Sequence, residues 1–164
     1  MLSEQMQKAL NEQIAAELFS AYLYLAMSAW FQSENLGGFA HWMDLQAREE
    51  QEHAMRICKH IYERRGRVIL EALDAPQSEW KSPLAAFEAA LGHEEMITGR
   101  INALVNQAIK EKDHATNNML QWFVSEQVEE EEQTDAIVQK LRLIQDAPRG
   151  MLLMLDRELA ARGE

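Results

Sequence analysis

Apolar residues recur every three or four positions through most of the chain, which is the spacing that gathers them on one face of an α-helix. The first such stripe runs from Leu10 to Ser28, and Ser3 precedes it with a side-chain oxygen that can cap a helix. Gly37 and Gly38 then interrupt the pattern. The sequence therefore predicts one long helix that ends before this glycine pair.

A second helix is predicted from Phe39 to a point near Gly66. Residues 67–83 follow it with two prolines and no helical period. Connections of this length are unusual in a compact domain, but one can carry the chain from one end of a helix bundle to the other. Two long helices joined in this way run parallel, as in bundles that contain a crossover connection.

The second half of the chain repeats the helical pattern. Ser82 and Pro83 read as a cap followed by proline at the first helical position, and the third helix extends to a polar break at residues 111–115. A fourth helix carries its stripe to Leu141, and Pro148 opens a short fifth helix. These elements predict an all-α bundle. The stripe of the fifth helix comprises Met151, Leu152 and Leu155.

The composition agrees with one helical domain that spans residues 1–164. Apolar residues make up 47% of the chain, and only seven glycines and three prolines interrupt it. The net charge of −11 argues against nucleic-acid binding, because no basic patch is available to neutralise phosphates. A strongly negative protein attracts cations instead.

Three features favour a cytoplasmic protein that does not cross a membrane. Cys58 is the only cysteine, which excludes an intrachain disulfide and fits a reducing compartment. The N-terminal residues lack the charged-then-apolar pattern of a signal peptide. The longest uncharged run, residues 18–33, is too short and too polar to span a bilayer.

Each predicted long helix carries ionisable or amide side chains at the centre of its apolar stripe. An unpaired buried carboxylate is costly, so it pairs with a cation, takes up a proton or binds a metal. No lysine or arginine lies at mid-helix in these stripes. The residues are Glu17 in the first helix, Glu50 and His53 in the second, Glu94 in the third, and Gln127 and Glu130 in the fourth.

The same interval separates these residues in the two halves of the chain. Glu17 and Glu50 are 33 residues apart (50 − 17), as are Glu94 and Gln127 (127 − 94), and in each half an ionisable residue follows three positions later. The pattern indicates a duplicated helix pair whose halves face each other across a pseudo-two-fold axis. Single acidic residues on helices usually lie on the surface. That alternative does not explain the equal spacing.

The residue types favour a metal site. Residues three apart lie on one helix face, so Glu50 and His53 can ligate the same ion, with Glu17 and Glu94 approaching from two other helices. Three carboxylates and one imidazole suit Fe, Mn or Zn better than Cu(I) or an iron–sulfur cluster. The number of carboxylates favours two ions bridged by Glu50, with Glu130 as a second candidate bridge.

These motifs resemble those of the ferritins over essentially the whole chain. The resemblance is carried by AAELFSAYLYL around Glu17, REEQEH at 48–53, GHEE at 92–95 and WFVSEQVEEE at 122–131. It implies a ferritin-like four-helix bundle with a long crossover between the second and third helices and a short fifth helix.

Three positions make the resemblance more specific. Gln127 and Glu130 stand where the general di-iron motif commonly has Glu and His, which is similar to the non-haem bacterial ferritins. Gln51 stands where bacterioferritins carry a haem-ligating Met, so we expect no haem.

The resemblance implies three iron sites in each chain. A first iron would be held by Glu17, Glu50 and His53, and a second by Glu94 and Glu130 with Glu50 bridging. Gln127 would be a weak ligand or hydrogen-bond donor beside the pair. A third iron would use Glu49, Glu126 and Glu129, with Glu130 shared.

Other residues receive weaker expectations. Without the resemblance, Glu126 and Glu129 would be read as a solvated acidic face, and Glu131 is still assigned to one. In ferritins a tyrosine placed like Tyr24 donates an electron during oxygen reduction, and Trp122 is a second candidate donor or a packed indole. The sequence identifies no partner for His41, His60, His93 and His114.

The implied function is iron storage with ferroxidase activity. The protein would oxidise Fe(II) with O2 (or H2O2) and store ferric oxyhydroxide inside a homo-oligomeric cage of about 24 chains. One alternative is a rubrerythrin-like di-metal peroxidase or oxidase that stores no iron, although rubrerythrins usually add a four-cysteine module. Another is a small DNA-protecting relative with iron sites between subunits, which the charge of −11 argues against.

Overall fold

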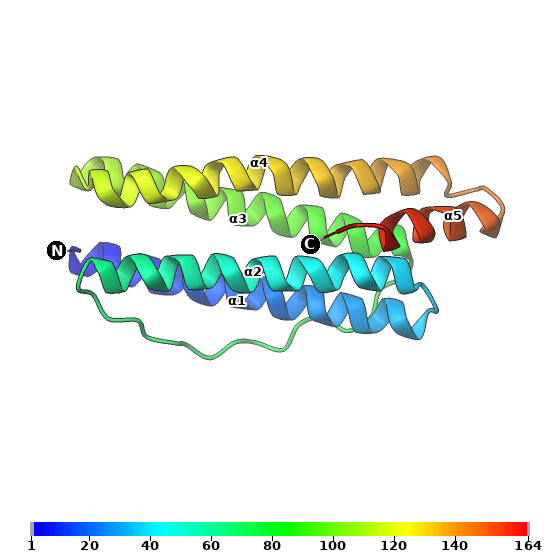
Figure 1. Ribbon diagram of the computed structural model, residues 1–164, viewed down its shortest axis with the longest axis horizontal. Coiled ribbons are helices and arrows are strands. Elements are labelled where there is room, and N and C mark those ends of the chain that lie inside the picture. The colour runs from blue at the N-terminus through cyan, green and yellow to red at the C-terminus, as the bar shows by residue number, and fades with distance from the viewer. Residues whose placement is uncertain (1, 164) are drawn as a thin grey trace.

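The computed structural model describes residues 2–163, and within this range the chain forms five helices and no strands. Four long helices lie side by side and a short fifth helix covers one end of the bundle (Figure 1). The helices are α1 Glu4–Ser33, α2 Gly37–Glu63, α3 Pro83–Glu111, α4 His114–Leu143 and α5 Arg149–Ala160.

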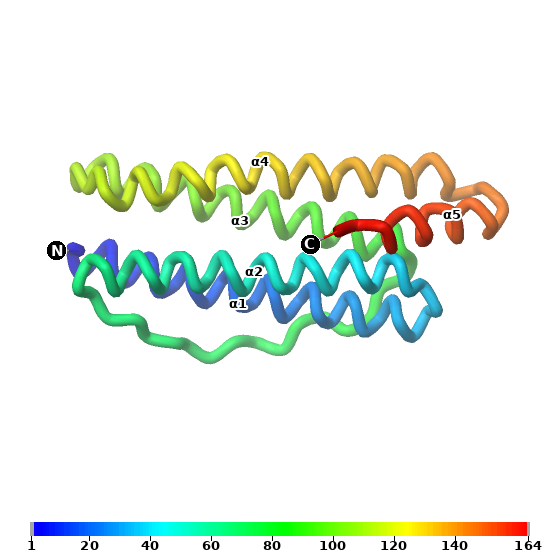
Figure 2. The backbone as a smooth tube through the Cα atoms, in the orientation of Figure 1, coloured from blue at the N-terminus to red at the C-terminus, as the bar shows by residue number. Residues whose placement is uncertain are grey.

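The predicted crossover is confirmed. α1 and α2 form one antiparallel pair and α3 and α4 form another, and residues 64–82 run along the outside of the first pair from one end of the bundle to the other (Figure 2). As a result α2 and α3 point in the same direction (Figure 1). The bundle therefore brings the centres of all four long helices to the same level.

Local chemistry sets the helix ends. The Ser3 hydroxyl accepts a hydrogen bond from the Met6 amide at 2.9 Å, and the Ser82 hydroxyl accepts one from the Ala85 amide at 3.1 Å, with Pro83 at the first helical position as predicted. The predicted polar break at 111–115 is much shorter. Only residues 112–113 separate α3 from α4.

The predicted stripe of the fifth helix is partly wrong. Leu155 and Leu159 are the buried side chains of α5, whereas Met151 is 43% exposed. The difference arises because α5 packs against the start of α2. There the Asp156 carboxylate accepts hydrogen bonds from the Gly38 amide at 2.8 Å and the Phe39 amide at 3.0 Å.

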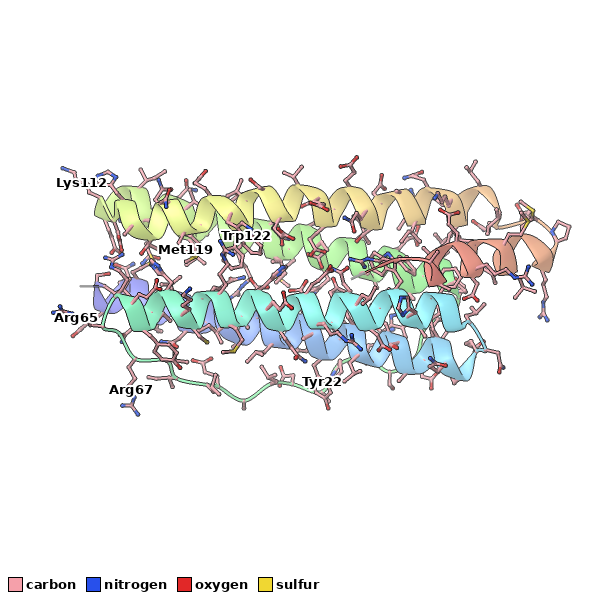
Figure 3. All side chains as sticks on the ribbon, in the orientation of Figure 1. Tyr22, Arg65, Arg67, Lys112, Met119 and Trp122 are labelled. Carbon is pink, nitrogen blue, oxygen red and sulfur yellow. The ribbon has the colours of Figure 1, made fainter. Side chains whose placement is uncertain are left out.

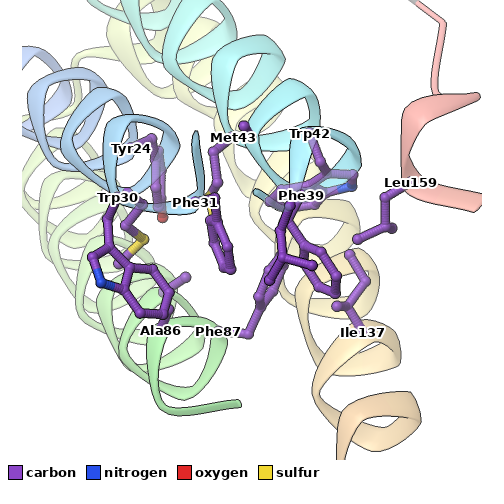
Figure 4. Close-up of a cluster of buried hydrophobic side chains, with 14 of the residues drawn as sticks. Tyr24, Trp30, Phe31, Phe39, Trp42, Met43, Ala86, Phe87, Ile137 and Leu159 are labelled. Atoms are coloured by element: carbon purple, nitrogen blue, oxygen red, sulfur yellow. The ribbon is translucent and has the colours of Figure 1, made fainter. Parts of the chain in front are cut away.

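Two apolar clusters fill the bundle. The aromatic cluster lies toward α5, where Phe31 stacks on Phe39 with ring centroids 5.1 Å apart and Trp42 lies 5.2 Å from Phe87 (Figure 4). The second cluster lies toward the N-terminal end of α1 and includes Met6, Leu10, Ile57, Ile101 and Leu120. The region between the two clusters is where the predicted polar residues lie.

Helix α1 is long and apolar enough, by length and composition, to cross a membrane. Half of its most apolar window is buried inside the bundle, however. Core helices of globular proteins pass the same test, since packing against other helices satisfies an apolar stripe as well as lipid does.

Candidate metal centre

The predicted polar residues all lie inside the bundle. Glu17, Glu50, His53, Glu94, Gln127 and Glu130 are each at most 5% exposed. The alternative in which the glutamates of these helices point to solvent is therefore excluded for this set. The helical period that buries the apolar stripes also buries the polar residues at their centres.

Three of these side chains converge on one point. Glu17, Glu50 and His53 each offer a ligand atom within 4.8 Å of the others. Glu17 Oε2, Glu50 Oε2 and His53 Nδ1 are buried atoms that accept or donate no hydrogen bond within the described residues. Because an unsatisfied buried polar atom costs about 1–3 kcal/mol, three on one point indicate a site shaped for a cation. Two carboxylates and one neutral imidazole fit a divalent transition metal.

A second group of ligand atoms shares Glu50 with the first. Glu50, Glu94 and Glu130 also lie within 4.8 Å of one another. One carboxylate common to both groups is the arrangement that a bridging ligand requires. The structure thus brings the residues predicted for two ions into adjoining groups.

Hydrogen bonds orient Glu94. The Tyr24 hydroxyl donates a short hydrogen bond to Glu94 Oε1, and Gln127 Nε2 donates to Glu94 Oε2 at 3.0 Å. Of the two roles expected for Gln127, this geometry is that of a hydrogen-bond donor. Tyr24 is linked directly to the site through its phenol oxygen.

Crowding and burial raise the pKa of every carboxyl in the centre. Burial raises the pKa of Glu17 to about 7, and burial followed by the charge of Glu94 raises that of Glu130 to about 9. Burial also raises the pKa of Glu50 well above its ordinary value and raises that of Glu94. A bound cation would reverse these shifts, so metal binding is expected to release protons.

His53 is held in its neutral form. Burial first, and then the charge of Arg56, lowers the pKa of His53 to about 4. Neutral imidazole keeps a lone pair free for a metal at physiological pH. Trp122 packs its ring edge against His53 with centroids 5.4 Å apart, while the Arg56 guanidinium lies 4.0 Å over the Trp122 ring.

A groove opens between α2 and α4 beside this contact. Its volume is about 720 Å³, and its lining includes Arg56, Lys59, Met119 and Trp122. Figure 3 shows Met119 and Trp122 directed from α4 toward α2. Trp122 is thus a packed indole at the wall of a groove, one ring away from the candidate ligand His53.

The structure brings together only part of the expected third site. Glu126 forms a group within 4.8 Å with His53 and Glu130. Burial, and then the charges of Glu129 and Glu49, raises the pKa of Glu126, so the negative charges of these residues act on one another. Glu129 is exposed and belongs to no such group among the described residues.

Glu131 differs from its expectation. It is half-buried, and its carboxylate accepts a short hydrogen bond from the Thr98 hydroxyl, so it is not simply part of a solvated face. Thr98 also lies 3.3 Å from Gln127 Nε2. Glu131 therefore belongs to the polar network that links α3 and α4 behind Glu94.

Three histidines have partners that sequence reasoning missed. His93 shares a hydrogen bond with the Ser20 hydroxyl at 2.8 Å, and His60 shares one with the Thr116 hydroxyl at 2.9 Å. His41 contacts the carbonyl oxygen of residue 162 at 2.9 Å. These partners come from other helices, which no local pattern identifies.

Sequence reasoning also missed an arginine–glutamine pair behind Glu17. Gln13 Nε2 donates to Glu17 Oε1 at 2.9 Å, and Arg100 Nε donates to Gln13 Oε1 at 2.9 Å. The amide thereby connects a guanidinium on α3 to a buried carboxylate on α1. The charge of Arg100 accordingly lowers the pKa of Glu17, against the larger effect of burial.

A second arginine–glutamine pair lies behind Glu130. Gln46 Nε2 donates a short hydrogen bond to Glu130 Oε2, and Arg162 Nη1 donates to Gln46 Oε1 at 3.0 Å. Gln13 and Gln46 are 33 residues apart (46 − 13). The interval that identified the carboxylates therefore applied to these amides too, but neither arginine carries any such signal.

Comparison with known sequences agrees with this centre. Residues 7–144 match the family described as "Ferritin-like domain". The chain is 41% identical over 162 residues to the bacterial non-heme ferritin of Bacteroides fragilis strain 638R, covering 99% of this chain and 100% of the relative. It is 40% identical over 153 residues to the bacterial non-heme ferritin of Campylobacter jejuni, covering 93% and 92%.

Solved structures agree as well. An open-pore ferritin from the archaeon Archaeoglobus fulgidus shares 53% identity with this chain and superposes with a TM-score of 0.97, covering 99% of this chain and 100% of that one. A protein described as a humanized archaeal ferritin gives 52% identity and a TM-score of 0.97, covering 99% and 98%. With the family match over most of its length and these full-length relatives, the chain belongs to the ferritin family.

Proposed function

We propose that this ferritin oxidises Fe(II) with O2 at the mid-bundle centre and stores the ferric product as an oxyhydroxide mineral inside a homo-oligomeric cage. The observation that carries the proposal is the convergence of unsatisfied buried atoms from Glu17, Glu50 and His53, with Glu50 shared by a second ligand group. Two ions that share one carboxylate lie close enough to deliver electrons to one O2 molecule.

Each ligand has a role in this proposal. The first iron is held by Glu17, Glu50 and His53, and the second by Glu94 and Glu130. The anionic carboxylates stabilise Fe(III) more than Fe(II), because the higher charge gains more from each negative oxygen. Oxidation is thereby favoured at the site itself. Gln127 keeps Glu94 oriented through its hydrogen bond.

The electrons can be counted. Two Fe(II) ions supply two electrons, which reduce O2 to H2O2 with two protons. Reduction to water takes two further electrons, which a third Fe(II) near Glu49, Glu126 and Glu129 and the Tyr24 phenol can supply. The Tyr24 hydroxyl donates to Glu94, so that carboxylate is placed to take the phenol proton as the electron leaves.

Apolar exposure supports assembly. A groove of about 320 Å³ on the α1 and α2 pair is lined by Tyr22, Leu25, Met55 and Leu73. Leu25 and Met55 are 52% and 61% exposed. Such a surface is typical of a protein contact, and symmetric homo-oligomers are the usual result. We propose a closed cage of about 24 chains, as the resemblance implies.

The cytoplasm is the proposed location. Fe(II) is available as a substrate in a reducing compartment, and the buried thiol Cys58 is unpaired, as is usual there. The acidic net charge of −11 favours uptake of cations by the assembled protein.

The test is aerobic Fe(II) loading of the metal-free protein, followed by size-exclusion chromatography with iron counted across the eluate. A store elutes as a large assembly with iron far in excess of its binding sites. Glu50→Ala and Glu130→Ala are each expected to slow oxidation on the order of 100-fold or more, while Glu132→Ala, an exposed acid on α4, changes nothing. Two or three irons per chain on a small oligomer would instead indicate a di-iron enzyme that stores no iron.

A further inference from the structure

The segment after α5 returns along the bundle toward its middle, where Arg162 docks on α2 (Figure 1). Arg162 Nη2 donates to Glu49 Oε2 at 2.7 Å and Nη1 donates to Gln46 Oε1 at 3.0 Å. The guanidinium also lies 4.7 Å over the ring of Trp42. With its side chain only 18% exposed, Arg162 is a fixed part of the α2 surface.

The contact with Gln46 has a defined direction. A guanidinium carries donors only, so it must meet the oxygen of the amide. Gln46 Nε2 is then turned inward, where it donates to Glu130. Arg162 thus holds the amide in the one orientation that provides a hydrogen bond to a carboxylate of the proposed di-iron centre.

The contact with Glu49 concerns the proposed third iron. Glu49 is one of the carboxylates expected to bind that ion, and its side chain is 41% exposed. A guanidinium at 2.7 Å already provides this carboxylate with a cation. An iron ion that uses Glu49 must therefore displace Arg162.

We propose that Arg162 is a positioning residue that competes with the third iron for Glu49 and so sets the affinity of that site. This inference rests on the proposed function, because it concerns an ion of the same reaction. The ion pair lost when Arg162 moves is subtracted from the free energy with which the ion binds. A weakly held third ion is free to move on toward the mineral, so Arg162 favours turnover over retention.

Charge removal tests the proposal. Arg162→Gln is expected to tighten binding of the third ion by about two- to five-fold, the range that a partly exposed ion pair supplies, and to leave the first two ions unchanged. Arg162→Lys keeps a cation that can pair with Glu49, so its third-ion affinity stays near that of the wild type. Arg157→Gln removes the same charge from the exposed side of α5 and serves as the matched control.

The measurement is an oxygen-free titration of the assembled protein with Co(II), followed by calorimetry and visible absorption. Co(II) reports binding without oxidation, so the result does not depend on ferroxidase activity. Glu49→Gln is expected to remove the third binding step, and adding Arg162→Gln to it should then have no further effect.

Several results would overturn the role assigned to Arg162. These are an unchanged third step in Arg162→Gln, an equal change in Arg157→Gln, a change confined to the first two steps, or the absence of a third step from every variant. The proposed function fails separately. If aerobic Fe(II) loading yields no mineral while Arg162→Gln still tightens the third Co(II), storage is wrong and the competition at Glu49 is right.

Discussion

At the scale of single residues, four carboxyls share a small buried volume, and this arrangement predicts a pH dependence. The folded pKa of Glu17 is raised from 4.5 to about 7, chiefly by burial. Between these two values the folded state binds a proton that the unfolded state has lost, so the free energy of unfolding falls as pH rises. The fall continues to about pH 9, where Glu130 titrates.

The expected loss of stability is on the order of 3 kcal/mol from Glu17 alone. Urea unfolding of the metal-free protein at pH 5, 7 and 9 measures it. Glu17→Gln should flatten the dependence, and Glu132→Gln, which is exposed, should not. A wild-type protein whose stability rises over this pH range would contradict the prediction.

Tyr24 provides a second prediction at this scale. Tyr24→Phe removes the hydroxyl that donates to Glu94 but leaves the candidate ligands in place. Without its electron, fewer O2 molecules are reduced to water. We expect two ions still to bind, the ratio of Fe(II) oxidised to O2 consumed to fall, and H2O2 release to rise several-fold. An oxygen electrode and a peroxide assay measure both quantities.

Tyr62→Phe is the control for this experiment, because Tyr62 is 60% exposed and lies near the end of α2. If Tyr24→Phe released no more H2O2 than Tyr62→Phe, the phenol would have no part in the electron count. The site would then reduce O2 with iron electrons alone.

The residues of the site were predictable to unequal degrees. Glu17 and Glu50 could be identified because a helical period fixes which side chains face inward, and the repeated interval singles them out. Arg100 and Arg162 could not. Each long side chain reaches another helix, and its target depends on how those helices pack, which residue spacing does not encode.

At the scale of elements, the contact between α5 and α2 is the feature that the sequence pattern described least well. Gly38 lies so close to α5 that an added Cβ would stand 1.7 Å from the Asp156 carbonyl oxygen. The two prolines, the glycine pair and the apolar stripes located the helices. They did not show that Asp156 accepts hydrogen bonds from the first turn of α2.

This close approach predicts that Gly38→Ala displaces α5. Backbone cannot yield as a flexible side chain does, so the expected cost is about 1–3 kcal/mol of unfolding free energy. Gly37→Ala is the matched control, because an added Cβ there meets nothing within 4 Å. Hydrogen exchange should show lost protection in α5 for Gly38→Ala only. Equal protection in the two variants would mean that α5 does not depend on this contact.

At the scale of the whole molecule, the metal centre lies between two apolar clusters. The aromatic cluster stabilises one half of the bundle and the second cluster the other half, so the polar middle need not contribute to stability. This division explains why four carboxyls with raised pKa values are tolerated in a core. It also explains why the interval of 33 residues persists, since each helix pair must present its polar positions at the same depth.

The exposed apolar groove on α1 and α2 extends the argument from the chain to its assembly. Leu25→Glu places a charge in the groove that contains Tyr22 and Leu73, and burying an unpaired charge at a subunit contact is strongly unfavourable. The candidate ligands all come from one chain, so we expect Fe(II) binding to persist while the assembly breaks into smaller species and mineral storage is lost. Val128→Glu alters an exposed apolar residue on α4, outside the groove, and is the control. Sedimentation velocity of iron-loaded samples separates the two outcomes. A full-size, iron-filled Leu25→Glu assembly would show that the groove is not a subunit contact.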